Sequence, residues 1–131
     1  MARISMIGAG NLATHLSLAL QASGHKVVQL FSRTAKTAVP LAQKLNCPFT
    51  TNLIELEQSD LAIIAVSDDV ISEVASQITL PMVHTSGTKG MEVLNQNALH
   101  GVLYPLQTFS KSKEVNFQNI PICVEASNKE F

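Results

Sequence analysis

The residues best suited to chemistry in this chain form a short glycine-containing loop near its beginning. The loop follows an apolar strand-like run, Ile4 to Ile7, and opens an apolar helix-like run that lasts to Ala22. It consists of Gly8, Ala9, Gly10, Asn11, Leu12 and Ala13. In a dinucleotide-binding loop, the first glycine permits a tight turn and the second lets backbone approach a pyrophosphate, while a small sixth residue lets the helix lie close to the strand. The free N–H groups and positive dipole at the helix N-terminus then favour bound phosphates.

The alternative interpretation of this loop is that its small residues serve only close packing of a helix on a strand. The flanking sequence favours binding, because Ser23-Gly24 is a typical helix stop and a second strand is predicted from Lys26 to Phe31. Strand, loop, helix and strand therefore occur in the order that a dinucleotide site requires.

The residues after the second strand indicate which dinucleotide is bound. An NAD site usually has an acid there, about 20 residues beyond the glycines, that accepts hydrogen bonds from the ribose. This chain has Ser32, Arg33 and Thr34 instead. Two hydroxyls and a guanidinium favour a 2′-phosphate, which a carboxylate would repel, and Arg33 can also stack on adenine. We therefore predict NADP rather than NAD, although an exposed arginine beside helix-capping residues is the alternative.

Strand and helix patterns alternate along the rest of the chain. Apolar spacing predicts a helix over 34–46 interrupted by Pro40, a short strand at 47–49, a short helix over 52–58 and a buried strand at 61–66. Further along we predict a helix over 70–78 capped by Ser67-Asp68-Asp69, strands at 81–84, 102–106 and 120–125, a helix over 91–97 and a polar connection over 110–119. The alternation predicts an α/β fold, a Rossmann-type, doubly wound, mostly parallel sheet with helices on both faces.

Ligands of such a sheet bind beyond the carboxyl ends of the strands. We expect Val66, Ser67 and Asp68 on the ribose and nicotinamide side of the cofactor, and Ser86 and Gly87 beside the substrate. A proton must accompany a hydride, so His84 is the candidate general acid, with Ser86 and Tyr104 as further catalytic candidates. The alternatives are a buried, hydrogen-bonded structural histidine and a tyrosine that fills the sheet edge.

Composition narrows the function classes. A length of 131 residues fits one domain, and a net charge of −1 predicts no nucleic-acid or membrane partner. Cys47 and Cys123 are isolated, so we expect reduced, buried thiols, no metal site and, without a signal peptide, a cytoplasmic protein. The first acid is Glu55, and the cations before it predict a field that favours an anionic ligand at the glycine loop. They are Arg3, Lys26, Arg33, Lys36 and Lys44.

The glycine loop, the Ser32–Thr34 segment and the 65–68 turn resemble the NADP-binding domains of three groups of enzymes. These are pyrroline-5-carboxylate reductases, 6-phosphogluconate dehydrogenase-like enzymes and deazaflavin-dependent NADP reductases. Segments 84–87 and 104–109 are more narrowly similar to a bacterial family of proposed oxidoreductases with a Rossmann-like N-terminal domain and a helical C-terminal domain of unknown function. Many relatives have His-Pro where this chain has Tyr104-Pro105, so a role for that histidine does not carry over.

The resemblance implies an NADP-binding domain over residues 1–126, with 127–131 starting a linker or helix to a helical domain through which the full-length protein forms a homodimer. It implies hydride transfer between NADP(H) and an unknown small imine or carbonyl substrate, for which the cofactor supplies the chemistry. The alternative function is a non-catalytic nucleotide-binding or sensing module.

Overall fold

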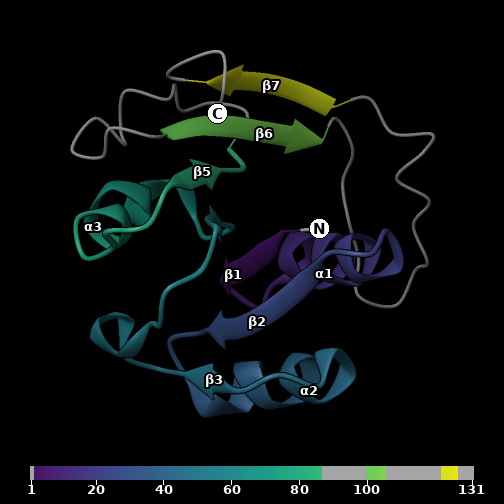
Figure 1. Ribbon diagram of the computed structural model, residues 1–131. Helices are drawn as coiled ribbons and strands as arrows, with labels where there is room; N and C mark the ends of the chain where they lie inside the picture. The colour runs from purple at the N-terminus through teal and green to yellow at the C-terminus, as the bar shows by residue number, and fades with distance from the viewer. Residues whose placement is uncertain (1, 87–99, 106–121, 127–131) are drawn as a thin grey trace.

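The chain folds around one seven-stranded sheet (Figure 1). A computed structural model describes residues 2–86, 100–105 and 122–126. The strands lie in the order β3-β2-β1-β4-β5-β6-β7. Their bounds are β1 Arg3–Ile7, β2 Lys26–Phe31, β3 Phe49–Thr50, β4 Leu61–Ile64, β5 Met82–His84, β6 His100–Pro105 and β7 Ile122–Ala126. The first six strands are parallel and β7 is antiparallel to β6, which confirms the predicted Rossmann-type α/β fold.

Helices cover both faces of the sheet (Figure 1). Helices α1 (Asn11–Ala22) and α2 (Ala35–Leu45) pack on one face, while the 3-10 turns η1 (Leu53–Glu55) and η2 (Asp68–Val70) and helix α3 (Ile71–Ala75) lie on the other. Ile63 of β4 faces the first layer and its neighbour Ile64 the second, which explains why this strand is apolar throughout. Among the described residues, no helix combines the length and apolar character that crossing a membrane requires.

The ends of the first two helices follow from local sequence. Gly24 adopts φ +95° after α1, and the His25 N–H donates to the Leu20 carbonyl at 3.0 Å, so the predicted stop is confirmed. The predicted interruption at Pro40 is wrong, because α2 runs unbroken through it to the left-handed Asn46. Proline removes only one helical hydrogen bond, and the buried apolar face of α2 continues on both sides of it.

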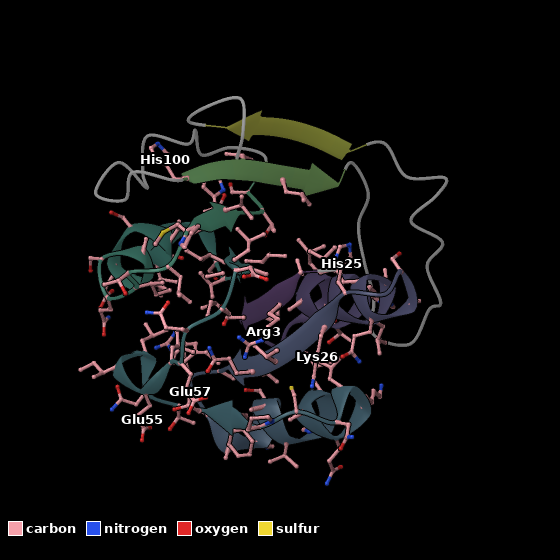
Figure 2. The ribbon with its side chains drawn as sticks, viewed as in Figure 1. Arg3, His25, Lys26, Glu55, Glu57 and His100 are labelled. Carbon is pink, nitrogen blue, oxygen red and sulfur yellow. The ribbon has the colours of Figure 1, made fainter. Side chains whose placement is uncertain are left out.

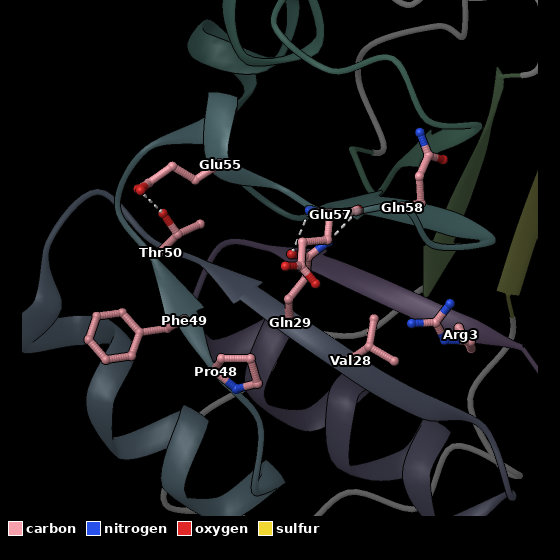
Figure 3. A pocket seen from close by; sticks show the side chains of 9 residues that line it. All are labelled: Arg3, Val28, Gln29, Pro48, Phe49, Thr50, Glu55, Glu57 and Gln58. Atoms are coloured by element: carbon pink, nitrogen blue, oxygen red, sulfur yellow. Dashed lines mark hydrogen bonds between the residues drawn. The ribbon is translucent and has the colours of Figure 1, made fainter.

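The connection from β3 to β4 differs from its prediction. Instead of a helix over 52–58 there is only η1, followed by an extended segment, 56–60, that we call the strap. The side-chain amide of Gln29 in β2 pairs with both backbone groups of Glu57, as a neighbouring peptide unit would. The Gln29 Nε2 donates to the Glu57 carbonyl at 2.8 Å, and the Glu57 N–H donates to the Gln29 Oε1 at 3.0 Å (Figure 3). Ser5 of β1 lies 2.7 Å from Ser59, hydroxyl to hydroxyl. These side-chain bonds take over the role of the helical bonds that the periodicity predicted.

The segment after β4 is also less helical than predicted. Ser67 occupies the N-cap position of η2 but makes no side-chain capping bond, and α3 ends at Ala75 rather than continuing to Ile78. Val70, the last residue of η2 and the N-cap of α3, has φ −117° and ψ 2°, so the predicted helix is divided at this residue into two short elements. The predicted helix over 91–97, the connection over 110–119 and the linker over 127–131 lie outside the described residues.

Candidate dinucleotide-binding site

The carboxyl ends of β1 and β4 define the centre of the site. These neighbouring strands lead to opposite faces of the sheet, because β1 continues into α1 and β4 into η2 and α3. Gly8 lies between them at φ +120°, and a Cβ there would stand 2.3 Å from the Ala65 carbonyl oxygen. The Gly8 N–H also donates to the Phe31 carbonyl at 2.7 Å. Glycine is therefore required at position 8 by the fold itself.

Gly10 has no such requirement. Its φ of −80° and ψ of −162° suit any residue, and an added Cβ would meet no atom of the described residues within 4 Å. Gly10 is also the N-cap of α1, where no side chain caps the helix and the first turn holds no acid. The backbone of Gly10 and the first N–H groups of α1 therefore border open space, which is the arrangement that an approaching phosphate needs.

Three loops at this edge enclose a cavity of about 590 Å³. It is lined by Gly8, Ala9, Gly10, Phe31, Ser32, Arg33, Thr34, Thr37, Ala65, Val66, Ser67 and Val70. The structure thus brings most of the predicted cofactor-site residues together. Four others do not line this cavity: Asn11 and Asp68 are exposed, Leu12 is half-buried, and Ala13 is fully buried on the core-facing side of α1, where its small size serves packing.

Hydroxyl groups surround Arg33 at one end of the cavity. Thr34 caps α2, accepting from the Thr37 N–H at 3.4 Å, and the Thr37 hydroxyl donates to the Thr34 carbonyl at 3.1 Å. The Ser32 hydroxyl is hydrogen-bonded to the Thr37 hydroxyl. The Thr34 and Thr37 hydroxyls also lie 3.1 Å apart, so the side chains of Ser32, Thr34 and Thr37 form one hydrogen-bonded group. Donation from the Thr34 O–H to a ligand would replace this internal bond. The proposed capping role is thus real and compatible with anion binding, and Thr37, absent from the sequence prediction, joins the group because it lies one helical turn after Thr34.

The cations of the first 54 residues do not all lie near the glycine loop. Arg3 and Lys26 are register partners at the amino ends of β1 and β2, so they occupy the opposite edge of the sheet (Figure 2). Arg33 and Lys36 lie near the N-terminal end of α2, whereas Lys44 is in its last turn. The local positive charge at the cavity therefore comes mainly from Arg33, and the predicted field of all five cations is wrong in its extent.

The candidate catalytic residues lie farther along the same edge. His84 ends β5 and is fully buried, and its Nδ1 accepts the Ser86 N–H at 3.0 Å. This bond places the proton of a neutral imidazole on Nε2. Neither His84 nor Ser86 lines the cavity. The Tyr104 backbone lies in β6 opposite Cys123 of β7, and Gly87 lies outside the described residues.

A second hollow lies on the α3 face of the sheet, and several polar side chains that line it are hydrogen-bonded within the protein. Figure 3 shows Arg3, Gln29 and Glu57 around it, with Glu55 hydrogen-bonded to Thr50 at 2.9 Å. The Gln29 amide that points into it is already bonded to the strap. Cys47, predicted to be buried, is half-buried and free, and desolvation by burial raises the pKa of its thiol above the ordinary value.

Comparison with known proteins identifies the family. The family model of NADP oxidoreductases, coenzyme F420-dependent, matches residues 3–86, which is more than half of the chain. The chain belongs to this family. A proposed NADP oxidoreductase from Bacteroides fragilis is 42% identical, with a TM-score of 0.93 over 98% of this chain and 53% of its own. Membership confirms the predicted kinship and establishes a nicotinamide-dinucleotide-binding Rossmann domain.

Two more distant members of the fold are known as solved structures. The 1-pyrroline-5-carboxylate reductase of Streptococcus pyogenes is 15% identical, with a TM-score of 0.71 over 95% of this chain and 48% of its own. An imine reductase from a Pseudomonas species is 19% identical, with a TM-score of 0.64 over 81% of this chain and 42% of its own. At these identities the likeness shows the fold alone. The chain spans about half the length of the Bacteroides fragilis and Streptococcus pyogenes proteins. The comparison with curated proteins found no match.

Proposed function

We propose that the chain binds NADP(H) in the 590 Å³ cavity and forms the cofactor-binding part of an oxidoreductase. The observation that carries this proposal is Gly10, whose missing side chain leaves open space that the fold does not need. The open N-terminus of α1 and the Ser32–Arg33–Thr34 segment border the same space, and none of the described residues that line it carries a carboxylate. This donor set fits a dinucleotide that carries a 2′-phosphate.

Each loop would hold a different part of the cofactor. The N–H groups at the start of α1 would donate to the pyrophosphate, and Arg33 with the neighbouring hydroxyls would bind the 2′-phosphate. Val66 and Ser67 would contact the ribose on the nicotinamide side. Bound NADPH supplies the hydride, so the protein needs only to orient it and exclude water.

For the substrate we propose a small imine or carbonyl compound. Two proteins that share the fold are an imine reductase and a 1-pyrroline-5-carboxylate reductase, which makes cyclic imines the first class to test. We keep His84, Ser86 and Tyr104 as candidates for the proton that accompanies the hydride; the buried Nδ1 of His84 is engaged by Ser86, so Nε2 would have to serve. A cytoplasmic location and a full-length homodimer complete the proposal.

Titration calorimetry with NADP and NAD tests the cofactor assignment. Replacing Arg33 by alanine should weaken NADP binding by about 1.5–3 kcal/mol, the usual value of a hydrogen bond to a charged group, and leave NAD binding nearly unchanged. Lys44→Ala is the matched control, because Lys44 lies in the last turn of α2 and does not line the cavity. Equal loss of affinity for both cofactors, or none for either, would contradict a 2′-phosphate at Arg33.

Turnover separates the enzyme from a binding or sensing module. The chain and its full-length Bacteroides fragilis relative should be assayed in parallel for NADPH oxidation with a panel of small imines and carbonyl compounds. Substrate-dependent oxidation by the relative supports the oxidoreductase, whereas tight NADPH binding without turnover across the panel supports the module.

A further inference from the structure

A smaller cavity adjoins the proposed NADP site. It has a volume of about 280 Å³ and shares Phe31, Arg33, Val66 and Val70 with the larger cavity. The inference drawn from it rests on the proposed function. In NADP the adenine is attached to the ribose carbon next to the one that carries the 2′-phosphate. A 2′-phosphate at Arg33 therefore places the base beside Arg33, and the adjoining cavity is the space available to it.

One face of the η2–α3 segment forms a wall of this cavity. Val70, Glu73 and Val74 line it at spacings of three and four residues, and Gln77 lines it from the turn after α3. Val70 and Val74 are half-buried and Val74 packs against the apolar core, whereas Glu73 and Gln77 are exposed. The wall is therefore apolar on its inner half and polar at its rim, as a purine requires, because the faces of the base are apolar and its edge carries the polar atoms.

The polar groups around the cavity differ in what they can still bind. The Asn52 side-chain oxygen already accepts from the Ile54 N–H at 3.1 Å as the cap of η1. Glu73 has no hydrogen-bond or ion-pair partner for its carboxylate among the described residues. A carboxylate is an acceptor only, so Glu73 is suited to a ligand edge that presents a donor.

We propose that Glu73 makes this cavity selective for a 6-aminopurine. The exocyclic amine of adenine is a donor, which the Glu73 carboxylate can accept, and the Gln77 amide can donate to a ring nitrogen at the same edge. A 6-oxopurine presents an acceptor at that position and faces the carboxylate with like polarity. Glu73 therefore acts as a specificity-determining residue for the base.

Binding of NADP and of its 6-oxo analogue, nicotinamide hypoxanthine dinucleotide phosphate, tests this role. The unmodified chain should prefer NADP by roughly tenfold in Kd, which corresponds to about 1.4 kcal/mol. Glu73→Gln should largely abolish the preference, because a carboxamide can accept from an amine and donate to a carbonyl. The ratio of the two Kd values cancels any general effect of the lost charge on the 2′-phosphate. Glu55→Gln, on η1 and outside this cavity, should keep the preference.

The outcomes distinguish this inference from the function on which it rests. Equal affinity of the unmodified chain for both ligands, or a preference that survives in Glu73→Gln, would overturn the role of Glu73 while the NADP site stands. A preference lost equally in Glu55→Gln would also overturn it. Failure to bind NADP at all would refute the proposed function, and the base selectivity with it.

Discussion

Replacing each glycine of the loop by alanine should affect a different property. Gly10→Ala should weaken NADP binding with little change in stability, whereas Gly8→Ala should strongly destabilise the fold. Gly10→Ala adds a methyl group at a φ that alanine readily adopts, where no atom in the described part of the chain lies within 4 Å. Reduced freedom of the unfolded chain should stabilise this variant by about 0.4–1 kcal/mol, and alanine is a poorer N-cap than glycine by a similar amount. The free energy of unfolding should therefore change by less than about 1 kcal/mol.

Ligand binding should change far more in this variant. The methyl group would occupy the space through which we propose the pyrophosphate passes. Losing one hydrogen bond to a charged phosphate costs about 1.5–3 kcal/mol, which is roughly a 10- to 150-fold rise in the Kd of NADP. Urea unfolding and titration calorimetry on the same preparation measure both quantities. NADP affinity equal to that of the unmodified chain would refute the proposed path of the phosphates over Gly10.

Gly8→Ala supplies the contrast. Its φ of +120° strains an alanine by about 1–3 kcal/mol. The contact of 2.3 Å with the Ala65 oxygen also forces the ends of β1 and β4 apart. The total is a large part of the roughly 5–15 kcal/mol that stabilises a typical domain, so the free energy of unfolding of this variant should be far lower than that of the unmodified chain. A folded, stable Gly8→Ala chain would show that the loop geometry is wrong.

Two further variants test the interior. Gln29→Ala removes the side chain that is hydrogen-bonded to the strap, so it should lower the free energy of unfolding by about 1–3 kcal/mol. Gln58 is exposed on the strap, so Gln58→Ala should change that free energy by less than about 0.5 kcal/mol. Equal effects of the two substitutions in urea unfolding would contradict the role of Gln29. Ser17 has a buried hydroxyl without a hydrogen-bond partner among the described residues, so Ser17→Ala should stabilise the chain by about 1–2 kcal/mol. The exposed control Ser72→Ala should gain only about 0.5 kcal/mol from helix propensity, and a gain as large as that of Ser17→Ala would argue against a buried polar cost.

The parts of the structure that depend on local pattern could be predicted from the sequence. The apolar runs before and after Gly8, and the stop at Gly24, predicted β1, α1 and β2 in their correct order. The strap could not be predicted in this way, because the bonds between Gln29 and Glu57 join residues 28 positions apart. Apolar spacing around them is compatible with a helix until the sheet brings that amide within reach.

The candidate site shows the same division. The sequence could place the Ser32–Thr34 segment in the site, because the residues that face the adenosine ribose of a dinucleotide follow the second strand directly in this fold. Whether Thr37 lines the cavity depends on the rotation of α2 about its axis. Which edge of the sheet Arg3 occupies depends on the direction of β1. Neither is evident from charge counts or from the motif alone.

The shortness of β3 limits how two copies of the chain can associate. An outer strand with unpaired backbone groups is a template on which a second chain can add a strand. Here that outer strand has only two residues, and Pro48 before it has no N–H to donate, while its carbonyl already accepts from Leu30 at 3.1 Å. Just beyond it, Asn52 turns the chain into η1. This edge is therefore a poor template for a strand from a second copy, and we expect a homodimer to form through other surfaces.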